Sequence, residues 1–328
     1  MRALIITEHG GPEVLKIGQV PDPEPGPGQI RVRVRACAIN RADILQRRGF
    51  YPAPLGTRQD IPGLEYAGEV EALGPGTLGW SVGDRVMGLV PGAGCAQKVV
   101  VHAREAIAAP EGLDWAQLGA IPEAFMTAYD ALLLQAGLRP GQRALIHAVG
   151  SGVGTAAVQL ARWSGAQTFG TARSDWKLER CKALGLDVGI DASSGSFLEA
   201  LKEATGGQGV DCVLDLVGGS YVLENLDALV SRGTIITVGL LGGGKAQVPL
   251  RTLMRKRLTW LGTVLRARPI EEKITLAQDF AHLVSPAFAT GALVPVVDKV
   301  FPIAQAVEAH RHMESNASFG KIVLTWDD

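Results

Sequence analysis

The chain has 328 residues, 47% of them hydrophobic, and a formal net charge of −1 from 32 basic and 33 acidic side chains. This length favours two domains, and the apolar fraction is large enough to fill sizeable cores, which excludes a disordered protein. The balanced charge, without a basic stripe interleaved with aromatic residues, argues against a nucleic-acid partner.

The chain carries no sequence signal for export or for membrane insertion. Its first residues, MRALIITEHGG, lack the cationic start and apolar run of a signal peptide, and no apolar segment is long enough to span a membrane. We therefore expect a cytoplasmic protein without a membrane partner. The cysteines lie far apart and form no CxxC pair, which predicts free core thiols: Cys37, Cys95, Cys181 and Cys212.

The first 122 residues contain short β-branched segments separated by Gly and Pro. Residues 30–39, 65–73 and 95–101 have the composition of strands. The segment PDPEPGPG, residues 21–28, is typical of a rigid surface connector between strands. This part of the chain therefore predicts a β-rich barrel or a partly open sheet.

Beyond Pro122 the pattern changes to strands that alternate with amphipathic helices. Strands are predicted at residues 143–147, 167–171, 210–216 and 234–238, and helices from about residue 152, over 177–184 and near 221–229. Such alternation is typical of a doubly wound parallel sheet of the Rossmann type. Two further helical stretches follow residue 268. The run FGKIVLTWDD, residues 319–328, then has no neighbouring strands in sequence, so we expect it to pair with the first domain.

The segment HAVGSGVG has the context of a dinucleotide-binding loop. It lies between the apolar strand ALIHA and the helix-forming run TAAVQLA, with a second strand at the appropriate distance. Glycines permit a tight turn and close approach of the backbone to a pyrophosphate, and the helix N-terminus offers N–H groups to the phosphates. The predicted contacts of this loop are Gly150, Ser151, Gly152, Val153 and Gly154, with the Ser151 hydroxyl as a donor.

The second strand of this unit ends without the acid that holds the ribose of NAD. In its place stand Thr171, Ala172 and Arg173, followed by Ser174 and Lys177. An acid would accept hydrogen bonds from the ribose hydroxyls and repel a 2′-phosphate, so neutral and basic residues favour NADPH. Arg173 and Lys177 are the predicted phosphate ligands, with Ser174 as a further donor.

Several blocks of sequence, in a consistent order along nearly the whole chain, resemble the zinc-free branch of the medium-chain dehydrogenase/reductase superfamily. Within that branch the closest resemblance is to NADPH quinone oxidoreductases related to zeta-crystallin. The matching blocks are INRADILQRRGFYP (39–52), PGLEYAGEV (62–70), VGDRVMGL (82–89), IPEAFMTAYDAL (121–132), the glycine loop, and FGKIVL (319–324).

The resemblance implies a discontinuous α/β layout. A GroES-like catalytic domain would comprise residues 1–121 and 266–328, with a Rossmann NADPH-binding domain inserted at 122–265. This layout accounts for the isolated terminal strand. It also places the expected active site in the cleft between the two domains.

The resemblance also predicts that no metal is bound. Zinc-dependent relatives place a Cys where this chain has Asn40 and a Gly-His-Glu where it has Gly63, Leu64 and Glu65. Only Glu123, at the place of the third ligand, keeps a side chain that could bind zinc. Without a Lewis acid, alcohol oxidation loses its main electrostatic support, whereas hydride transfer to an electron-poor conjugated carbonyl stays feasible.

Asn40 and Tyr51 are the candidate catalytic residues, because they stand in the family's cleft segment and could contact nicotinamide or substrate. A structural amide that closes a turn and an aromatic wall are equally compatible with these two positions. Asp43 is expected to serve the helix start, and His147 to brace the core or a loop.

Further cofactor contacts follow from the resemblance alone. Thr127 is expected to donate its hydroxyl at the nicotinamide end. Two strand ends that line the nicotinamide in relatives contribute mainly through their backbone: Gly239, Leu240 and Leu241, and Thr263, Val264 and Leu265. Many relatives carry a Tyr near the 2′-phosphate where this chain has Ala192, so the preference for NADPH depends more heavily on Arg173 and Lys177.

The leading functional prediction is an NADPH-dependent quinone reductase that acts by direct hydride transfer. One alternative is an NADPH-dependent enoyl or alkenal reductase on the same fold. A second is a cofactor-binding protein with little turnover and a structural or RNA-binding role, against which the neutral charge balance counts. Residues 233–263 supply an apolar strand and a Gly-rich loop, and relatives dimerise through this sheet edge, so a homodimer is expected.

Overall fold

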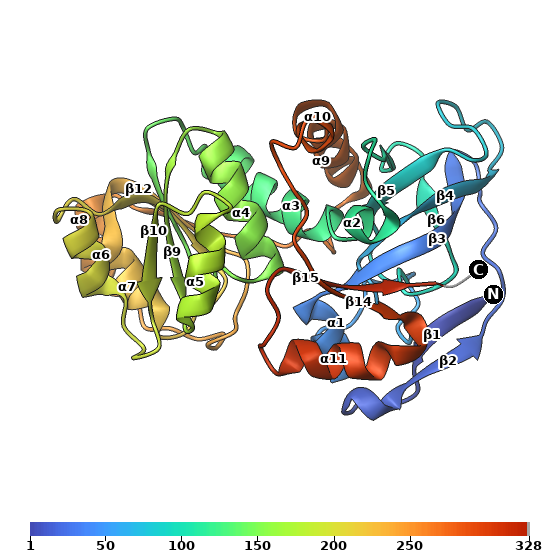
Figure 1. Ribbon diagram of the computed structural model, residues 1–328, viewed down its shortest axis with the longest axis horizontal. Helices are drawn as coiled ribbons and strands as arrows, with labels where there is room; N and C mark the ends of the chain where they lie inside the picture. Colours follow the sequence, from blue (N-terminus) through green and yellow to red (C-terminus); the bar gives the residue numbers. More distant parts are fainter. Residues whose placement is uncertain (327–328) are drawn as a thin grey trace. The chain divides into compact units, whose positions relative to one another are not determined.

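The computed structural model describes residues 1–326 (Figure 1). This part of the chain forms two compact units. The first unit comprises Met1–Met126 and the chain from Leu265 onward, and the second comprises Thr127–Val264. Among the described residues, no helix combines the length and the apolar composition needed to cross a membrane.

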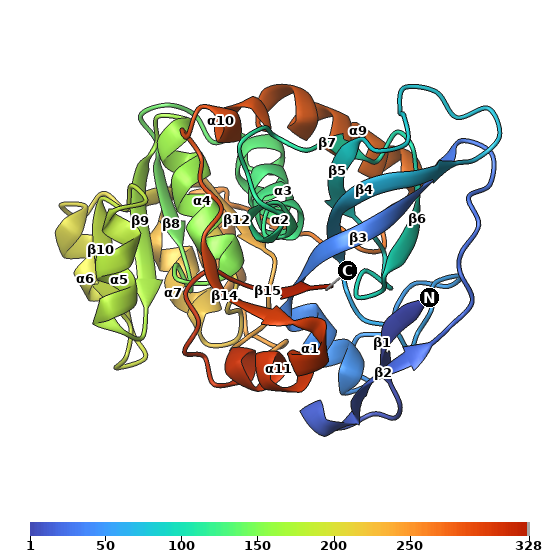
Figure 2. The ribbon, with the colours of Figure 1, turned by 45° about the vertical axis from the view of Figure 1, so that its right-hand side comes forward.

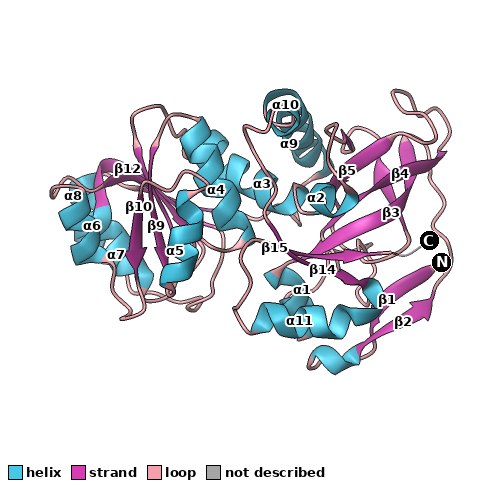
Figure 3. Ribbon diagram, viewed as in Figure 1, coloured by secondary structure: helices cyan, strands magenta, loops and turns pink. Residues whose placement is uncertain are grey.

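The strands and helices are distributed along the whole chain (Figure 3). The strands are β1 (Arg2–Ile6), β2 (Leu15–Gln19), β3 (Gln29–Ile39), β4 (Glu65–Leu73), β5 (Arg85–Leu89), β6 (Lys98–His102), β7 (Ile107–Ala108), β8 (Arg143–Ile146), β9 (Gln167–Ala172), β10 (Val188–Asp191), β11 (Val210–Asp215), β12 (Leu229–Thr237), β13 (Thr259–Gly262), β14 (Val297–Pro302) and β15 (Lys321–Thr325). The α-helices are α1 (Arg41–Arg47), α2 (Trp115–Gly119), α3 (Pro122–Tyr129), α4 (Gly152–Trp163), α5 (Asp175–Lys182), α6 (Leu198–Ala204), α7 (Tyr221–Ala228), α8 (Leu250–Lys256), α9 (Ile270–Leu283), α10 (Pro286–Ala289) and α11 (Ala306–Glu314). A π-helix, η2 (Asp130–Gln135), follows α3, and the 3₁₀ turns are η1 (Pro12–Val14) and η3 (Ile303–Gln305).

The first unit is built on a seven-stranded sheet in the order β14-β15-β3-β4-β5-β7, with β6 also paired to β3; β1 and β2 form a separate pair. Apolar residues on alternate positions of β3, among them Ile30, Val32 and Val34, are buried and join the main core of the unit. The terminal strand β15 pairs antiparallel with β3, so the expectation for residues 319–328 is confirmed as far as Trp326. Asp327 and Asp328, the end of that run, lie outside the described residues.

The second unit contains a six-stranded parallel sheet in the order β10-β9-β8-β11-β12-β13. Helices α4 and α5 contact the half formed by β8, β9 and β10, while α7 and α8 contact β12. Figure 2 shows α4, α5 and α7 from a second side. This arrangement confirms the predicted doubly wound Rossmann sheet. β13 is an edge strand of this sheet. The homodimer expected through this edge stays a prediction.

Two element boundaries differ from the sequence-based ones for local reasons. The helix predicted to start at 177 begins at Asp175, because Ser174 has extended geometry and an acidic residue suits the first turn. The strand predicted at 234–238 already begins at Leu229. Arg232 adopts a positive φ of 68°, and a register shift in the pairing with β11 lets the strand continue through the SRG sequence.

A buried histidine in the first unit links stability to pH. His310 on α11 is 1% exposed, and its Nδ1 accepts a hydrogen bond from the buried Arg47 guanidinium at 3.1 Å. Within the described residues 1–326, its Nε2 has no hydrogen-bond partner. Burial, together with the positive charge of Arg47, lowers the pKa of His310 to about 3.

We expect this histidine to make the protein less stable as the pH falls below about 6.5, the pKa of an unfolded histidine. Between that value and the folded pKa of about 3, only the unfolded chain binds the proton. As the pH falls through this window, the free energy of unfolding therefore decreases by up to about 1.4 kcal/mol per pH unit. Above about pH 6.5 the contribution of His310 to stability is fully present. Urea denaturation at pH 5–7.5 tests this: His310→Gln should reduce the slope, whereas His282→Gln, at an exposed position, should not. Equal slopes for the two variants would contradict the assignment.

Candidate active-site and cofactor-binding residues

A buried ion pair forms the centre of a polar cluster in the first unit. The Glu65 carboxylate is fully buried, and its Oε1 accepts hydrogen bonds from Lys321 Nζ at 2.7 Å and from Asn40 Nδ2 at 2.9 Å. Its Oε2 accepts a bond from the backbone N–H of Glu123 at 2.8 Å. The desolvated carboxylate is thus balanced by one cation and by two neutral donors.

Strand register brings these groups together. β3 pairs with β15, which places Ile39 opposite Ile322, and on its other side it pairs with β4. Asn40 directly follows β3, whereas Lys321 opens β15 and Glu65 opens β4. Since both neighbours run antiparallel to β3, their first residues lie beside its end.

The Asn40 side-chain amide contributes to this cluster as both a hydrogen-bond donor and an acceptor. Besides donating to Glu65, it accepts a bond from Lys321 Nζ at 2.6 Å. Its backbone N–H donates to Asp43 Oδ2 at 2.7 Å, and Asp43 Oδ1 also accepts from Gly63 N at 2.7 Å. Of the two roles that the sequence left open for Asn40, the contacts favour the structural one. Asp43 has the expected scaffold role at the start of α1.

Tyr51 is held by an arginine that the sequence analysis did not single out. Arg266, 7% exposed, donates to the backbone carbonyls of Tyr51 at 3.2 Å and Pro91 at 2.6 Å and to the side chain of Gln46. Its guanidinium lies 5.2 Å from the centre of the Tyr51 ring. Burial raises the pKa of the Tyr51 phenol, so the phenol stays protonated at neutral pH.

Beside this cluster the first unit has a small pocket that is open to solvent. Its walls are largely apolar, and its polar groups come from three side chains. The lining residues are Leu64, Leu89, Val90, Glu123, Leu265, Arg266 and Lys273.

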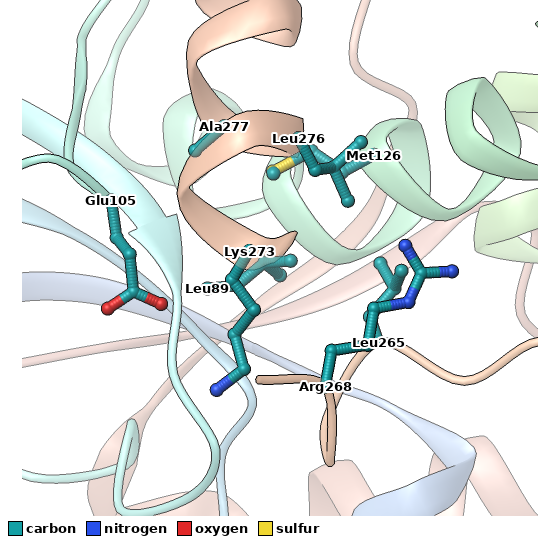
Figure 4. A pocket seen from close by; sticks show the side chains of 8 residues that line it. All are labelled: Leu89, Glu105, Met126, Leu265, Arg268, Lys273, Leu276 and Ala277. Atoms are coloured by element: carbon teal, nitrogen blue, oxygen red, sulfur yellow. The ribbon is translucent and has the colours of Figure 1, made fainter. Parts of the chain in front are cut away.

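A neighbouring small pocket shares three of these residues and extends along α9 (Figure 4). Lys273, Leu276 and Ala277 line it from α9, and Glu105 and Met126 from other elements. Burial raises the pKa of Glu105, and the charge of Lys273 opposes that rise. Together the two pockets offer apolar walls with charged groups at defined places, a combination suited to a small, largely apolar ligand.

In the second unit the glycine loop opens α4 as the sequence predicts. Ser151 is the N-cap, and its Oγ accepts a bond from Gly154 N at 3.0 Å, which leaves its hydroxyl hydrogen to donate. A Cβ on Gly154 would lie 2.5 Å from the Ala148 carbonyl oxygen, and one on Gly150 would lie 2.9 Å from Lys177 Cδ. At position 154 the close atom belongs to the backbone, so only glycine fits there, whereas at position 150 the Lys177 side chain would have to move.

Arg173, Ser174 and Lys177 follow the carboxyl end of β9. Arg173 is exposed, and the Lys177 side chain passes over Gly150. The Lys177 ammonium also lies 5.3 Å from the centre of the Trp176 ring. The positive charge of Arg173 affects Tyr221, whose pKa is raised mainly by burial. Two cations therefore lie near the predicted phosphate loop.

These residues fit a nicotinamide dinucleotide. The twelve-residue helix α4 directs its first amides into a loop without side chains at Gly150 and Gly154, as a pyrophosphate requires.

Thr171, predicted from the sequence to bind cofactor, has a side chain that faces the interior of the sheet. Its side chain is 1% exposed, its hydroxyl is bonded to His147 Nδ1 at 2.8 Å, and its carbonyl accepts from Val149 N. His147 Nε2 lies 2.6 Å from Asn225 Oδ1, and burial lowers the histidine pKa. Thr171 therefore serves the interior of the sheet, and His147 has the bracing role that the sequence predicts.

The remaining predicted cofactor residues occupy different environments. Thr127 is 5% exposed on α3. Thr263 is bonded to Asp130 Oδ2 at 3.1 Å and to Gln135 Nε2 at 2.8 Å, so its hydroxyl serves the π-helix η2. Three of the other positions are exposed: Leu240, Leu241 and Val264. Gly239 lies against Leu216. Leu265 belongs to the first unit and lines both pockets.

Sequence reasoning missed Glu65, Lys321 and Arg266 as members of the polar cluster. The signal for Lys321 was a charged residue at the start of an otherwise apolar strand, KIVL. A charge in such a position requires a buried partner. No local pattern identified Glu65 or Arg266, whose partners lie far away in sequence.

Two family models match this chain. One described as an alcohol dehydrogenase GroES-like domain matches residues 26–131, and one described as a zinc-binding dehydrogenase matches residues 152–281. Among the described residues 1–326, no three His, Cys, Asp or Glu side chains are grouped so that they could bind one metal ion.

Relatives include both free-standing enzymes and segments of much larger proteins. Quinone oxidoreductase of Rattus norvegicus is 30% identical over 99% of this chain and 97% of its own length. The pikromycin polyketide synthase component PikAII of Streptomyces venezuelae is 37% identical over 88% of this chain, but the match spans only 8% of that protein. The chain thus corresponds to a small part of the polyketide synthases that it matches.

Solved structures resemble the whole chain. Quinone oxidoreductase of Escherichia coli complexed with NADPH superposes with a TM-score of 0.89 at 28% identity, covering 99% of this chain and 100% of that one. The CurK enoyl reductase gives a TM-score of 0.89 at 26% identity, covering 99% of both chains. With the glycine loop, the parallel sheet and the rat relative that matches over its full length, these comparisons show that the chain belongs to the medium-chain dehydrogenase/reductase family of nicotinamide-dependent oxidoreductases.

Proposed function

We propose that this protein reduces quinones with NADPH by direct hydride transfer. The proposal rests on the side chains found at two positions where zinc-dependent relatives bind their metal. Leu64 is aliphatic, and the Asn40 amide is bonded to Glu65 and Lys321. An acceptor that is already electron-poor, such as a conjugated carbonyl, suits a site of this kind.

NADPH, when bound, supplies the hydride. The chain's own residues bind and orient the reactants: the glycine loop holds the pyrophosphate, and Arg173 with Lys177 favours a 2′-phosphate over a free hydroxyl. In the first unit, the Glu65–Lys321 pair fixes the end of β3, and Arg266 fixes the Tyr51 segment beside the pocket. The apolar walls of the pocket favour a flat ring.

The quinone assignment draws support from the similarity to quinone oxidoreductases of rat and Escherichia coli. The second candidate, an NADPH-dependent enoyl or alkenal reductase, is favoured by the similarity to CurK and to a segment of the pikromycin synthase. Both reactions begin with hydride transfer to a conjugated acceptor, and the difference lies in the shape and charge of the substrate pocket.

Initial rates of NADPH oxidation by the purified protein distinguish these candidates. We expect an ortho-quinone to react at least about tenfold faster than an acyclic enone and NADPH to be used in preference to NADH, because the site suits planar rings and a 2′-phosphate. Faster reduction of the enone would favour the enoyl reductase. Tight NADPH binding without turnover of either acceptor would favour a binding protein.

A further inference from the structure

Glu123 carries a carboxyl group that faces the pocket of the first unit and that the fold does not use. Its backbone N–H donates to Glu65, which anchors the start of α3. Within residues 1–326, no hydrogen bond or ion pair is recorded for its side chain, although it lines the pocket with Leu64, Leu89 and Arg266. A partly buried carboxyl without a structural partner, beside a pocket, is available for chemistry.

The positive and negative side chains around Glu123 balance one another without a charge on the Glu123 carboxyl group. Lys321 on β15 is paired with Glu65 on β4 at 2.7 Å. The positive charge of Arg266 interacts with the carboxylate of Asp43 on α1. Lys273 lines the pocket from α9 and acts on Glu105, and Tyr51 is neutral. A third carboxylate would leave the enclosed cluster with an uncompensated negative charge, so the neutral acid is the favoured form.

The protonation state follows from the same surroundings. Burial and then the negative charge of Glu65 raise the pKa of Glu123 to about 8, and Lys321 only partly opposes this rise. At neutral pH the carboxyl therefore holds its proton. A pKa close to the working pH is what a general acid needs, since the group can both donate and recover a proton.

We propose that Glu123 is the general acid that donates the proton completing substrate reduction in this pocket. The inference rests on the proposed function. Hydride transfer adds two electrons and one hydrogen to the quinone and leaves an anionic oxygen. The O–H bond of Glu123 breaks as a new O–H bond forms on that oxygen, so the product is a neutral hydroquinone. The resulting Glu123 carboxylate recovers a proton from water.

The other acidic groups nearby are less suited to this step. Burial raises the pKa of Asp43 to about 6, but its two oxygens accept hydrogen bonds from the backbone N–H groups of Asn40 and Gly63, which oppose that rise, so it is mostly ionised at neutral pH. The Tyr51 phenol is an even weaker acid than usual because burial raises its pKa. Glu65 accepts three hydrogen bonds and balances Lys321.

The variant Glu123→Gln keeps the size and neutrality of the side chain but removes its transferable proton. With an ortho-quinone, the wild-type kcat should fall as the pH rises through about 8, because the acid loses its proton. We expect Glu123→Gln to lower kcat by about 100-fold, to change KM by less than about threefold, and to abolish this pH dependence. Glu123→Asp should keep the pH dependence at a reduced rate. Glu111→Gln, at an exposed position of the same unit, is the matched control and should leave all of these unchanged.

Infrared difference spectroscopy between pH 6.5 and 9.5 tests the protonation state without turnover. A protonated-carboxyl band that is lost at high pH, and is absent from Glu123→Gln, would support the inference. A Glu123→Gln enzyme with the wild-type rate and pH profile, or a wild-type spectrum without that band, would overturn it. Failure of the wild type to reduce any conjugated carbonyl would instead overturn the proposed function, and the inference with it.

Discussion

Replacing Lys321 by methionine is expected to lower the free energy of unfolding by about 3–5 kcal/mol. The Lys321 and Glu65 side chains are 5% and 0% exposed, and the ammonium donates to Glu65, Asn40 and the Ile39 carbonyl. Methionine occupies a similar volume but leaves the Glu65 carboxylate buried without a cation. Urea denaturation monitored by tryptophan fluorescence at pH 7 gives the difference.

Two further variants separate the buried charge from the loss of packing. Glu65→Gln combined with Lys321→Met removes both charges, while the single amide oxygen of Gln can still accept either from Asn40 or from Glu123 N. We expect this double variant to recover more than half of the lost stability. Lys182→Met breaks an exposed pair whose 2.6 Å separation from Glu179 is even shorter, and should change stability by less than about 0.5 kcal/mol. Equal effects of Lys321→Met and Lys182→Met would show that burial does not determine the strength of the pair.

Local patterns were sufficient to predict the architecture. The glycine loop, flanked by a strand and a helix, predicted the β8–α4 turn, because Gly154 is required by backbone contacts within a few residues of chain and Gly150 lies against the Lys177 side chain of the next helix. The alternation of strands and helices predicted the parallel sheet, since each crossover leaves its own signal. The isolated strand at Lys321 was correctly assigned to the first unit because a strand without local partners must pair elsewhere.

The details of the site depended on contacts between distant segments and could not be predicted in the same way. Glu65 meets Lys321 across 256 positions, and Arg266 reaches Tyr51 across 215. The resemblance to relatives directed attention to Asn40 and Tyr51, but not to the groups that bind them. For Thr171, its place at the end of a strand suggested the cofactor, whereas its side chain is bonded to His147 in the interior. Side-chain direction at a strand end depends on register, which the sequence did not specify.

Replacing Arg173 by aspartate is expected to reverse the preference between NADPH and NADH. Arg173 is exposed just after β9, where an acid holds the adenosine ribose in many NAD enzymes. Aspartate would remove a charge-assisted bond to a 2′-phosphate and repel that phosphate, but would accept bonds from the hydroxyls of NADH. We expect the Kd of NADPH to rise by about 100-fold, equivalent to about 3 kcal/mol, while the Kd of NADH falls or stays the same.

Binding is measured by quenching of tryptophan fluorescence, for which the half-exposed Trp176 beside Lys177 is a suitable reporter. The control is Lys202→Asp on α6, which makes the same change of charge in the same unit at a residue paired with Glu199. Because long-range electrostatics act on both variants, only a local contact predicts a large effect at Arg173 and a small one at Lys202. Equal weakening of NADPH binding in both would assign the preference to the overall charge of the unit. Equal binding of NADPH and NADH by the wild type would remove the basis for reading the residues after β9 as a phosphate site.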